Sequence, residues 1–247
     1  MKQLLIFLAA AFVLVVAYPA FAQKVRKETF ESQGKKRTYY LVVPDQAKVD
    51  HPAPLLVLLH GSGHNGLSLV DKWKDLANKE GVIIAGPDST NPESWKTPMD
   101  GPDFLRDLIS ELQSKYAIDQ HRLYLFGHSG GAVFALYMAL FESEYFAAVA
   151  VHAGALSPKD TSIVAATKRK IPIYLAVGTV DPLFPLTDVR ATRDMLNKNG
   201  FNAQLTEIKG HDHWYYDLAP KINADVWNFL KEQKLADDPH YTQYSFK

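Results

Sequence analysis

The 247-residue sequence contains no cysteine, which excludes disulfide bonds, a thiolate nucleophile and thiolate metal ligands. It also has no excess of charge, because 27 basic residues balance 27 acidic ones, so no electrostatic affinity for nucleic acid is expected. No linker, charge block or internal repeat with a period of about 20 to 50 residues divides the chain. With 47% hydrophobic and 22% charged residues, the sequence predicts a globular protein held together by core packing.

Only the N-terminus carries a long hydrophobic run, residues 4–16. Lys2 precedes this run, and Pro19 and Ala20-Phe21-Ala22 follow it, which is the layout of a signal peptide with an A-x-A cleavage site. The run is short for a membrane span of about 20 apolar residues. We therefore expect residues 1–22 to be a signal peptide, and residues 23–247 to form a single domain in the periplasm or outside the cell, with no membrane contact after cleavage. Removing Lys2 leaves 26 basic against 27 acidic residues, a net charge of −1.

The rest of the chain alternates between strand-like and helix-like stretches. Residues 25–31 and 37–43, separated by Gln33-Gly34-Lys35, predict an antiparallel hairpin. Apolar strands are predicted at 54–60, 82–85, 122–126, 146–151, 171–177 and 203–208, and helices at 67–79, 103–116, 129–141, 186–199 and 217–231. Alternation of this kind implies parallel strands with right-handed crossovers. The sequence predicts a three-layer α/β fold, with a mostly parallel sheet and an N-terminal antiparallel hairpin.

The sharpest motif is Gly127-His128-Ser129-Gly130-Gly131, which stands between a predicted strand and a predicted helix. A G-x-S-x-G sequence in this position is typical of a nucleophile elbow, whose tight turn needs small residues beside the serine. The alternative is a glycine-rich turn whose serine caps the helix. We predict Ser129 as a nucleophile.

A serine nucleophile needs a base, and the base needs a carboxylate to orient it. In this class of elbow the chain order is serine, then acid, then histidine. Asp181 is the predicted acid because it follows an apolar strand; Asp188 and Asp212 are reserves, and the alternative for Asp181 is a turn aspartate before a proline. Either His211 or His213 occupies the loop where the base is expected.

Two histidines spaced i, i+2 can also bind a metal, but no third ligand stands at a useful spacing, so neither a metal nor another cofactor is expected. Hydrolysis by a serine nucleophile further needs donors for an oxyanion. These are predicted to be the N–H groups of Gly130 and of Ser62, which lies in a glycine-rich loop after the first long apolar strand. His60 and His64 in that loop are interpreted as structural.

These motifs resemble the esterase branch of the α/β-hydrolases that includes polyhydroxybutyrate depolymerases and feruloyl or acetylxylan esterases. The similarity covers residues 37–230 and runs through residues 59–63, 100–105 and 118–124 as well as the elbow. The stretch His211-Asp212-His213-Trp214-Tyr215-Tyr216 departs from the Gly-His-Thr-Trp-Pro-Gly of the depolymerases. It is similar to the Asp-His-x-Tyr-Tyr of the esterase D group, where the histidine after the aspartate is catalytic, so the resemblance favours His213 as the base.

The resemblance implies an α/β-hydrolase fold and hydrolysis of a small or polymer-borne ester with a short acyl, feruloyl, acetyl-sugar or hydroxyalkanoate group. Only residues 154–170 separate two predicted strands late in the chain, which leaves little length for a lid and favours an open site. Trp214, Tyr215 and Tyr216 are expected to stack on substrate or to pack in the core. The alternatives are an oligopeptidase-type serine peptidase, which needs a further domain, and a non-catalytic binding protein on the same scaffold.

Overall fold

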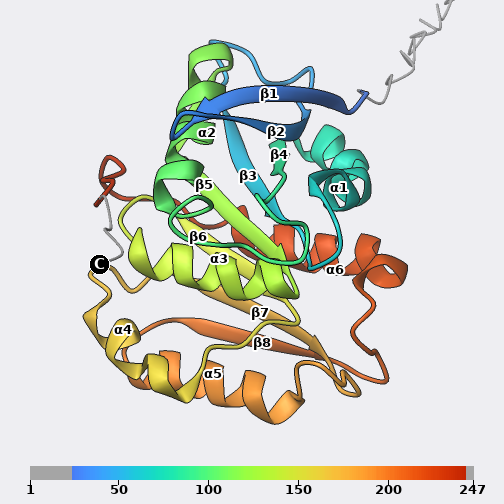
Figure 1. Ribbon diagram of the computed structural model, residues 1–247, viewed down its shortest axis with the longest axis vertical. Helices are drawn as coiled ribbons and strands as arrows, with labels where there is room; N and C mark the ends of the chain where they lie inside the picture. The colour runs from blue at the N-terminus through green and yellow to red at the C-terminus, as the bar shows by residue number, and fades with distance from the viewer. Residues whose placement is uncertain (1–23, 243–247) are drawn as a thin grey trace, which may run out of the picture.

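The computed structural model describes residues 24–242, so the predicted signal peptide lies outside the described residues. The strands form one eight-stranded sheet in the order β1-β2-β4-β3-β5-β6-β7-β8 (Figure 1). Their bounds are β1 Arg26–Ser32, β2 Lys35–Val42, β3 Ala53–Leu59, β4 Ile83–Pro87, β5 Ile118–His128, β6 Ala148–His152, β7 Ile173–Gly178 and β8 Ala203–Ile208. Strand β2 is antiparallel to both neighbours, and the strands from β4 to β8 pair in parallel. The predicted mostly parallel sheet is confirmed.

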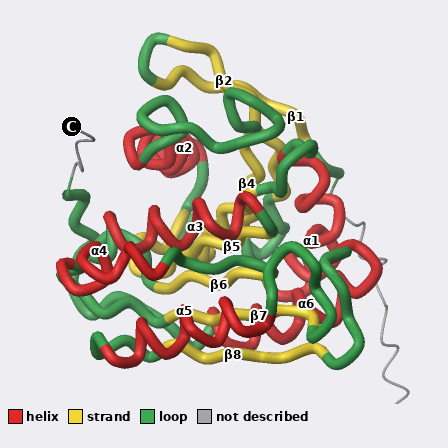
Figure 2. Tube along the Cα trace, turned by 60° about the horizontal axis from the view of Figure 1, so that its bottom comes forward, coloured by secondary structure: helices red, strands yellow, loops and turns green. Residues whose placement is uncertain are grey.

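Helices cover both faces of this sheet (Figure 2). Helices α1 (Gly66–Glu80) and α6 (Tyr215–Leu230) pack on one face. Helices α2 (Pro102–Lys115), α3 (Gly130–Phe141) and α5 (Leu186–Lys198) pack on the other. The three layers are those predicted, although α6 begins two residues before the predicted Asp217 and β5 extends beyond residues 122–126 at both ends.

The predicted N-terminal hairpin is confirmed, with a tighter turn than expected. Ser32 pairs with Lys35, so only Gln33 and Gly34 remain in the turn. Both have positive φ, 50° and 72°, as a type I′ turn requires. The turn type matches the twist of the two strands and sets their register.

Strand β3, at the centre of the sheet, is apolar throughout because both of its faces are covered. Every residue of β3 is buried. Leu55, Val57 and Leu59 point into the core beneath α2, α3 and α5, whereas Leu56 and Leu58 point into the core beneath α1 and α6. Side chains alternate between the two faces of a strand, so a continuous hydrophobic run supplies both cores at once.

One short helix was not predicted from the sequence. Residues 154–170 hold a 3₁₀ turn, Pro158–Asp160, and helix α4, Thr161–Ala166. Within α4 only Val164 is buried, so the segment carries no apolar stripe that would have indicated a helix. Across residues 24–242, none of the helices combines the length and apolar character that a bilayer crossing demands.

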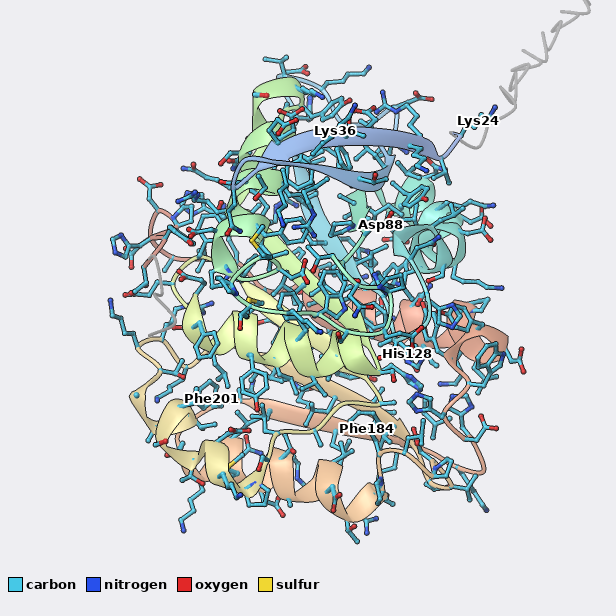
Figure 3. The ribbon with its side chains drawn as sticks, viewed as in Figure 1. Lys24, Lys36, Asp88, His128, Phe184 and Phe201 are labelled. Carbon is cyan, nitrogen blue, oxygen red and sulfur yellow. The ribbon has the colours of Figure 1, made fainter. Side chains whose placement is uncertain are left out.

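The carboxyl ends of the parallel strands meet at one edge of the sheet, where ligands bind in open α/β sheets. His128 ends β5 at this edge and Phe184 follows β7 there, whereas Phe201, just before β8, lies at the opposite edge (Figure 3). The fold thus gathers the loops that carry the predicted site residues.

Candidate active site

Ser129 occupies a strained turn between β5 and α3. Its backbone has φ 56° and ψ −121°, a conformation that L-residues seldom adopt outside functional sites. The close approach of neighbouring chains requires glycine on both sides: a Cβ on Gly127 would lie 2.2 Å from the Gly131 oxygen, and one on Gly131 would lie 2.0 Å from the Leu59 oxygen. This packing explains why the motif has glycine at its first and last positions.

The structure brings Ser129 together with His213 and Asp181. His213 Nε2 lies 2.9 Å from Ser129 Oγ, and His213 Nδ1 lies 2.9 Å from Asp181 Oδ2. A carboxylate only accepts hydrogen bonds, so Nδ1 carries a proton and a neutral ring leaves Nε2 free to accept the serine proton. This is the geometry of an activated hydroxyl.

The carboxylate of Asp181 is held by its own loop. Its side chain has 0% exposure, and Oδ1 accepts the N–H groups of Leu183 and Phe184, each at 2.9 Å. The Phe184 ring stacks on His213, with centroids 5.8 Å apart and planes 12° apart. The two hydrogen bonds fix the Asp181 carboxylate, and the ring contact with Phe184 fixes the His213 imidazole.

The other candidate acids and base lie elsewhere. His211 is buried with its ring 5.3 Å from that of His152, and its Nε2 has no hydrogen-bond partner within residues 24–242. Asp212 Oδ1 accepts a hydrogen bond from the Trp214 N–H at 2.8 Å. Asp188 Oδ1, near the start of α5, accepts one from the Thr187 hydroxyl at 3.3 Å. In the described part of the chain, none of the three makes a hydrogen bond to Ser129 or His213.

The predicted oxyanion donors lie side by side. A Cβ added to Gly130 would lie 2.8 Å from Ser62 Oγ and 3.6 Å from Ser62 N. Neither the Ser62 nor the Gly130 N–H donates a hydrogen bond to another protein group within residues 24–242. Gly130 also begins α3, whose dipole favours negative charge at this end. Two unused donors next to Ser129 can stabilise an oxyanion.

The loop after β3 is held by His60, in the structural role expected of it. His60 Nδ1 donates to the Gly61 oxygen at 2.9 Å, and Nε2 accepts the Ser89 N–H at 3.2 Å. Burial lowers the pKa of His60, so its ring is neutral, as these two bonds require. The Trp95 indole N–H donates to the His60 oxygen at 2.9 Å and so connects this loop to the one after β4.

A cavity of about 500 Å³ begins at Ser62 and Gly130, and the sequence interpretation did not find it. The stacked rings of Trp95 and Phe134, 4.8 Å apart and inclined by 9°, form one wall. Its remaining lining comprises Glu93, Ser94, Thr97, Val133, Tyr137, Met138 and Phe141. The lining residues of α3 recur at helical spacing, so the sequence could have indicated this wall of the cavity. Trp95 lies in an irregular loop, where no periodic pattern could have indicated it.

Two buried histidines beneath the elbow were also missed as a pair. His128 Nδ1 lies 3.1 Å from His152 Nδ1, and the His128 ring centroid is 5.0 Å from that of His213. Burial lowers the pKa of His128 to about 3 and that of His152 to about 2. Both rings are therefore neutral at physiological pH, and the Nδ1–H of one ring donates a hydrogen bond to Nδ1 of the other. No group of three or more histidine or acidic side chains within residues 24–242 is arranged to hold a metal ion.

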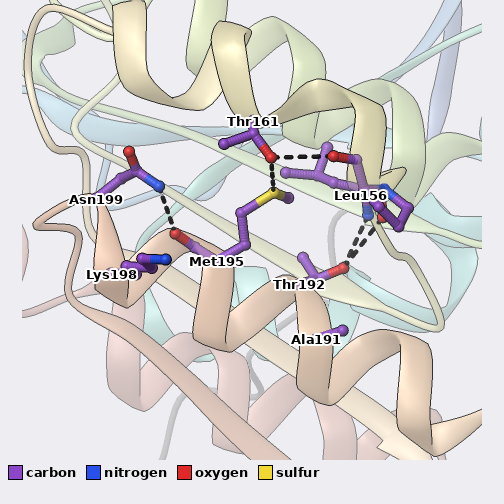
Figure 4. A pocket seen from close by; sticks show the side chains of 8 residues that line it. Leu156, Thr161, Ala191, Thr192, Met195, Lys198 and Asn199 are labelled. Carbon is purple, nitrogen blue, oxygen red and sulfur yellow. Dashed lines mark hydrogen bonds between the residues drawn. The ribbon is translucent and has the colours of Figure 1, made fainter.

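A second cavity, of about 380 Å³, lies between residues 156–161 and α5 (Figure 4). Thr192 Oγ1 accepts the Leu156 N–H at 2.9 Å, and the Thr161 hydroxyl contacts the Met195 sulfur at 3.4 Å. None of the predicted site residues lines this cavity. The candidate active site is therefore the edge that carries Ser129.

Several proteins are similar to this chain. NocK of Nocardia uniformis subsp. tsuyamanensis, which is named as an esterase, is 32% identical over 164 residues, 62% of this chain and 47% of that protein. The bifunctional acetylxylan esterase/xylanase XynS20E of Neocallimastix patriciarum is 28% identical over 155 residues, 60% of this chain. The chain thus spans about half of the first relative and 22% of the second.

Solved structures share the fold at lower identity. A ferulic acid esterase from Anaeromyces mucronatus superposes with a TM-score of 0.66 at 20% identity, covering 90% of this chain and 93% of that one. An S-formylglutathione hydrolase from Staphylococcus aureus gives a TM-score of 0.70 at 15% identity, covering 84% and 98%. The sequence pattern of the phospholipase/carboxylesterase family matches residues 100–231, more than half of the chain. The chain belongs to the phospholipase/carboxylesterase family, on the α/β-hydrolase fold that its motifs predicted.

Proposed function

We propose that this protein is a secreted serine esterase that hydrolyses carboxylic esters through an acyl-enzyme on Ser129. The observation that carries the proposal is the hydrogen-bonded series Ser129–His213–Asp181 beside two unused N–H donors. The family membership and the names of the relatives support the same reaction class. A binding protein on this scaffold would have no need for a strained serine in contact with an oriented imidazole.

In the proposed mechanism, His213 Nε2 removes the proton of Ser129 as Oγ attacks the ester carbonyl carbon. The carbonyl electron pair moves onto oxygen, which the Ser62 and Gly130 N–H groups stabilise. When the pair returns, the C–O bond to the alcohol breaks and His213 gives its proton to the departing alcohol. Water then repeats the sequence on the acyl-enzyme and releases the acid, while Asp181 stabilises the imidazolium at each stage.

The cavity walled by Trp95 and Phe134, which we call the acyl cavity, indicates which part of the ester binds there. The leaving alcohol must lie near His213, which protonates it, whereas the cavity begins at the oxyanion donors and contains neither His213 nor Phe184. The cavity is therefore proposed to bind the acyl group. Its volume of about 500 Å³ and its Trp95–Phe134 wall suit an aromatic acid of the feruloyl type better than the smaller acetyl or hydroxyalkanoate groups.

Covalent labelling and hydrolysis test the proposal together. A fluorophosphonate probe should label the wild-type protein but not Ser129→Ala, and methyl ferulate and p-nitrophenyl acetate should be hydrolysed only by the wild type. We expect a loss on the order of 10⁶ in kcat for Ser129→Ala. Equal activity of the two proteins would exclude Ser129 as the nucleophile, and cleavage of peptides but not esters would favour the peptidase alternative.

Secretion is tested separately from catalysis. Expressed from the full sequence in a bacterial host, the protein should be recovered outside the cytoplasm with Gln23 as its first residue, because signal peptidase cleaves after Ala-x-Ala. A chain beginning at Gln23 should remain inside the cell. Recovery of the intact N-terminus in the cytoplasm would contradict this part of the proposal.

A further inference from the structure

The exposed large hydrophobic side chains of the described residues are concentrated around the candidate active site. Five such side chains occur within residues 24–242: Val49, Leu67, Val180, Leu183 and Trp214. Val180, Leu183 and Trp214, which are 59%, 65% and 48% exposed, lie on the two loops that carry Asp181 and His213. We call Val180, Leu183 and Trp214 the apolar rim.

The rim is held by the contacts that hold the acid and the base. The Val180 N–H donates to the His211 oxygen at 3.1 Å, which joins the two loops, and the Leu183 N–H donates to Asp181 at 2.9 Å. Trp214 follows His213 directly, and its N–H donates to the Asp212 carboxylate at 2.8 Å. The backbone that carries these exposed side chains is therefore held in place by hydrogen bonds.

Ring contacts extend the rim toward the oxyanion loop. The Trp214 ring lies 5.0 Å from the Tyr216 ring and 6.1 Å from the His64 ring, centroid to centroid. His64 and Tyr216 are themselves 5.1 Å apart. Trp214 thus presents an aromatic surface that reaches from the loop of the base toward the loop of Ser62.

We propose that the apolar rim binds the alcohol part of the ester and selects apolar or aromatic alcohols over small polar ones. The inference rests on the proposed function, because His213 must lie beside the departing alcohol in order to protonate it. An alcohol in that place contacts the side chains around His213, and exposed hydrophobic groups there gain by being covered. The acyl cavity, next to the oxyanion donors, binds the acyl group, so the two halves of the ester occupy different surfaces.

Methyl, hexyl and benzyl esters of one acid, butyrate, test this inference. The three alcohols have similar basicity, so differences in kcat/KM report contacts of the alcohol rather than its ease of departure. We expect the wild-type protein to prefer the benzyl and hexyl esters to the methyl ester. Leu183→Ser and Trp214→Ser should each lower the benzyl-to-methyl ratio of kcat/KM by roughly tenfold, the lower end of the range for loss of a small apolar contact.

Val49 supplies a matched control. It is 91% exposed and precedes β3, at the opposite edge of the sheet from Ser129, so Val49→Ser removes a comparable surface group without touching the rim. Its benzyl-to-methyl ratio should equal that of the wild type. Hydrolysis of the methyl ester by each rim variant verifies that the catalytic groups are still assembled.

The possible outcomes distinguish a failure of the rim inference from a failure of the esterase proposal. If both rim variants keep the wild-type ratio while the methyl ester is hydrolysed, the rim does not bind the alcohol, and the esterase proposal stands. If the ratio is kept but adsorption to butyrate-ester droplets is lost, the rim is a surface-docking site and the inference is overturned. If the wild type hydrolyses no ester and resists the fluorophosphonate probe, the proposed function itself fails.

Discussion

The guanidinium of Arg37 donates to Asp100 Oδ1 at 2.7 Å, and the two side chains are only 5% and 0% exposed. Asp100 also accepts the Thr90 N–H, the Thr90 hydroxyl and the Lys96 N–H, at 3.0, 2.8 and 2.8 Å. The carboxylate therefore ties β2 to the loop after β4. That loop carries Trp95, so a buried ion pair far from Ser129 along the chain supports one wall of the proposed acyl cavity.

Breaking this ion pair should destabilise the protein strongly. Asp100→Ala leaves a buried guanidinium without its counter-charge, a change that costs about 3–5 kcal/mol in comparable pairs. Lys221→Ala removes the exposed pair with Asp225 and should cost less than about 1 kcal/mol. Urea unfolding curves measure both, and equal costs for the two variants would contradict the structural role given to Asp100.

His213 and His211 should differ sharply in mutational effect. His213→Ala removes the group that contacts Ser129 Oγ, so kcat/KM should fall by several orders of magnitude, approaching the effect of Ser129→Ala. His211→Asn removes a ring whose Nε2 has no hydrogen-bond partner in the described residues and should lower kcat/KM by less than about tenfold. The reverse order of effects would assign the base to His211.

Asp181→Asn should impair catalysis with little change in the fold. An amide in place of the carboxylate no longer stabilises the imidazolium or selects the tautomer with the proton on Nδ1, so kcat should fall about 10⁴-fold. Asp188→Asn, at a reserve position near the start of α5, is the matched control and should retain activity. Steady-state kinetics on p-nitrophenyl acetate distinguish them, and comparable losses would argue against Asp181 as the acid.

The neutral histidines under the elbow make stability depend on pH. The pKa values of His128 and His152 lie near 3 and 2 in the folded state, against 6.5 for an unperturbed histidine. Between these limits the unfolded chain binds protons that the folded chain does not, so the free energy of unfolding decreases as the pH falls below 6.5. The slope approaches about 1.4 kcal/mol per pH unit for each histidine.

Unfolding in urea at pH 7.5 and pH 5.0 measures this effect. His152→Gln removes one titrating group and should reduce the loss of stability between the two pH values. His51→Gln changes a histidine whose side chain is 79% exposed and should leave the loss unchanged. A wild-type protein equally stable at both pH values would show that the pair does not resist protonation.

The acyl cavity can be filled without altering the catalytic groups. Val133 lines it from α3, so Val133→Phe should block an aromatic acyl group and leave room for acetate. We expect kcat/KM for methyl ferulate to fall at least about tenfold, while that for p-nitrophenyl acetate changes little. Equal changes on both substrates would indicate that the aromatic acid binds elsewhere.

Much of the fold followed from local pattern. The apolar runs that became β3 and β7 and the amphipathic stretches that became α2 and α5 are periodic over enough residues to predict their type. Boundaries moved by a few residues, as at α6, which begins at Tyr215 rather than at the predicted Asp217. Helix α4 lacks an apolar face and left no pattern to find.

By itself, the sequence determined the elbow at Ser129, because strand β5, the turn at Ser129 and helix α3 are contiguous and depend on neighbouring residues. Only the tertiary structure decided which histidine faces it. His211 and His213 share one loop and similar neighbours, but the His211 backbone packs against Gly178, where a Cβ would lie 2.0 Å from its oxygen, and its ring turns toward His152. Contacts between residues that are far apart in the chain depend on how all the elements pack, and no local pattern carries that information.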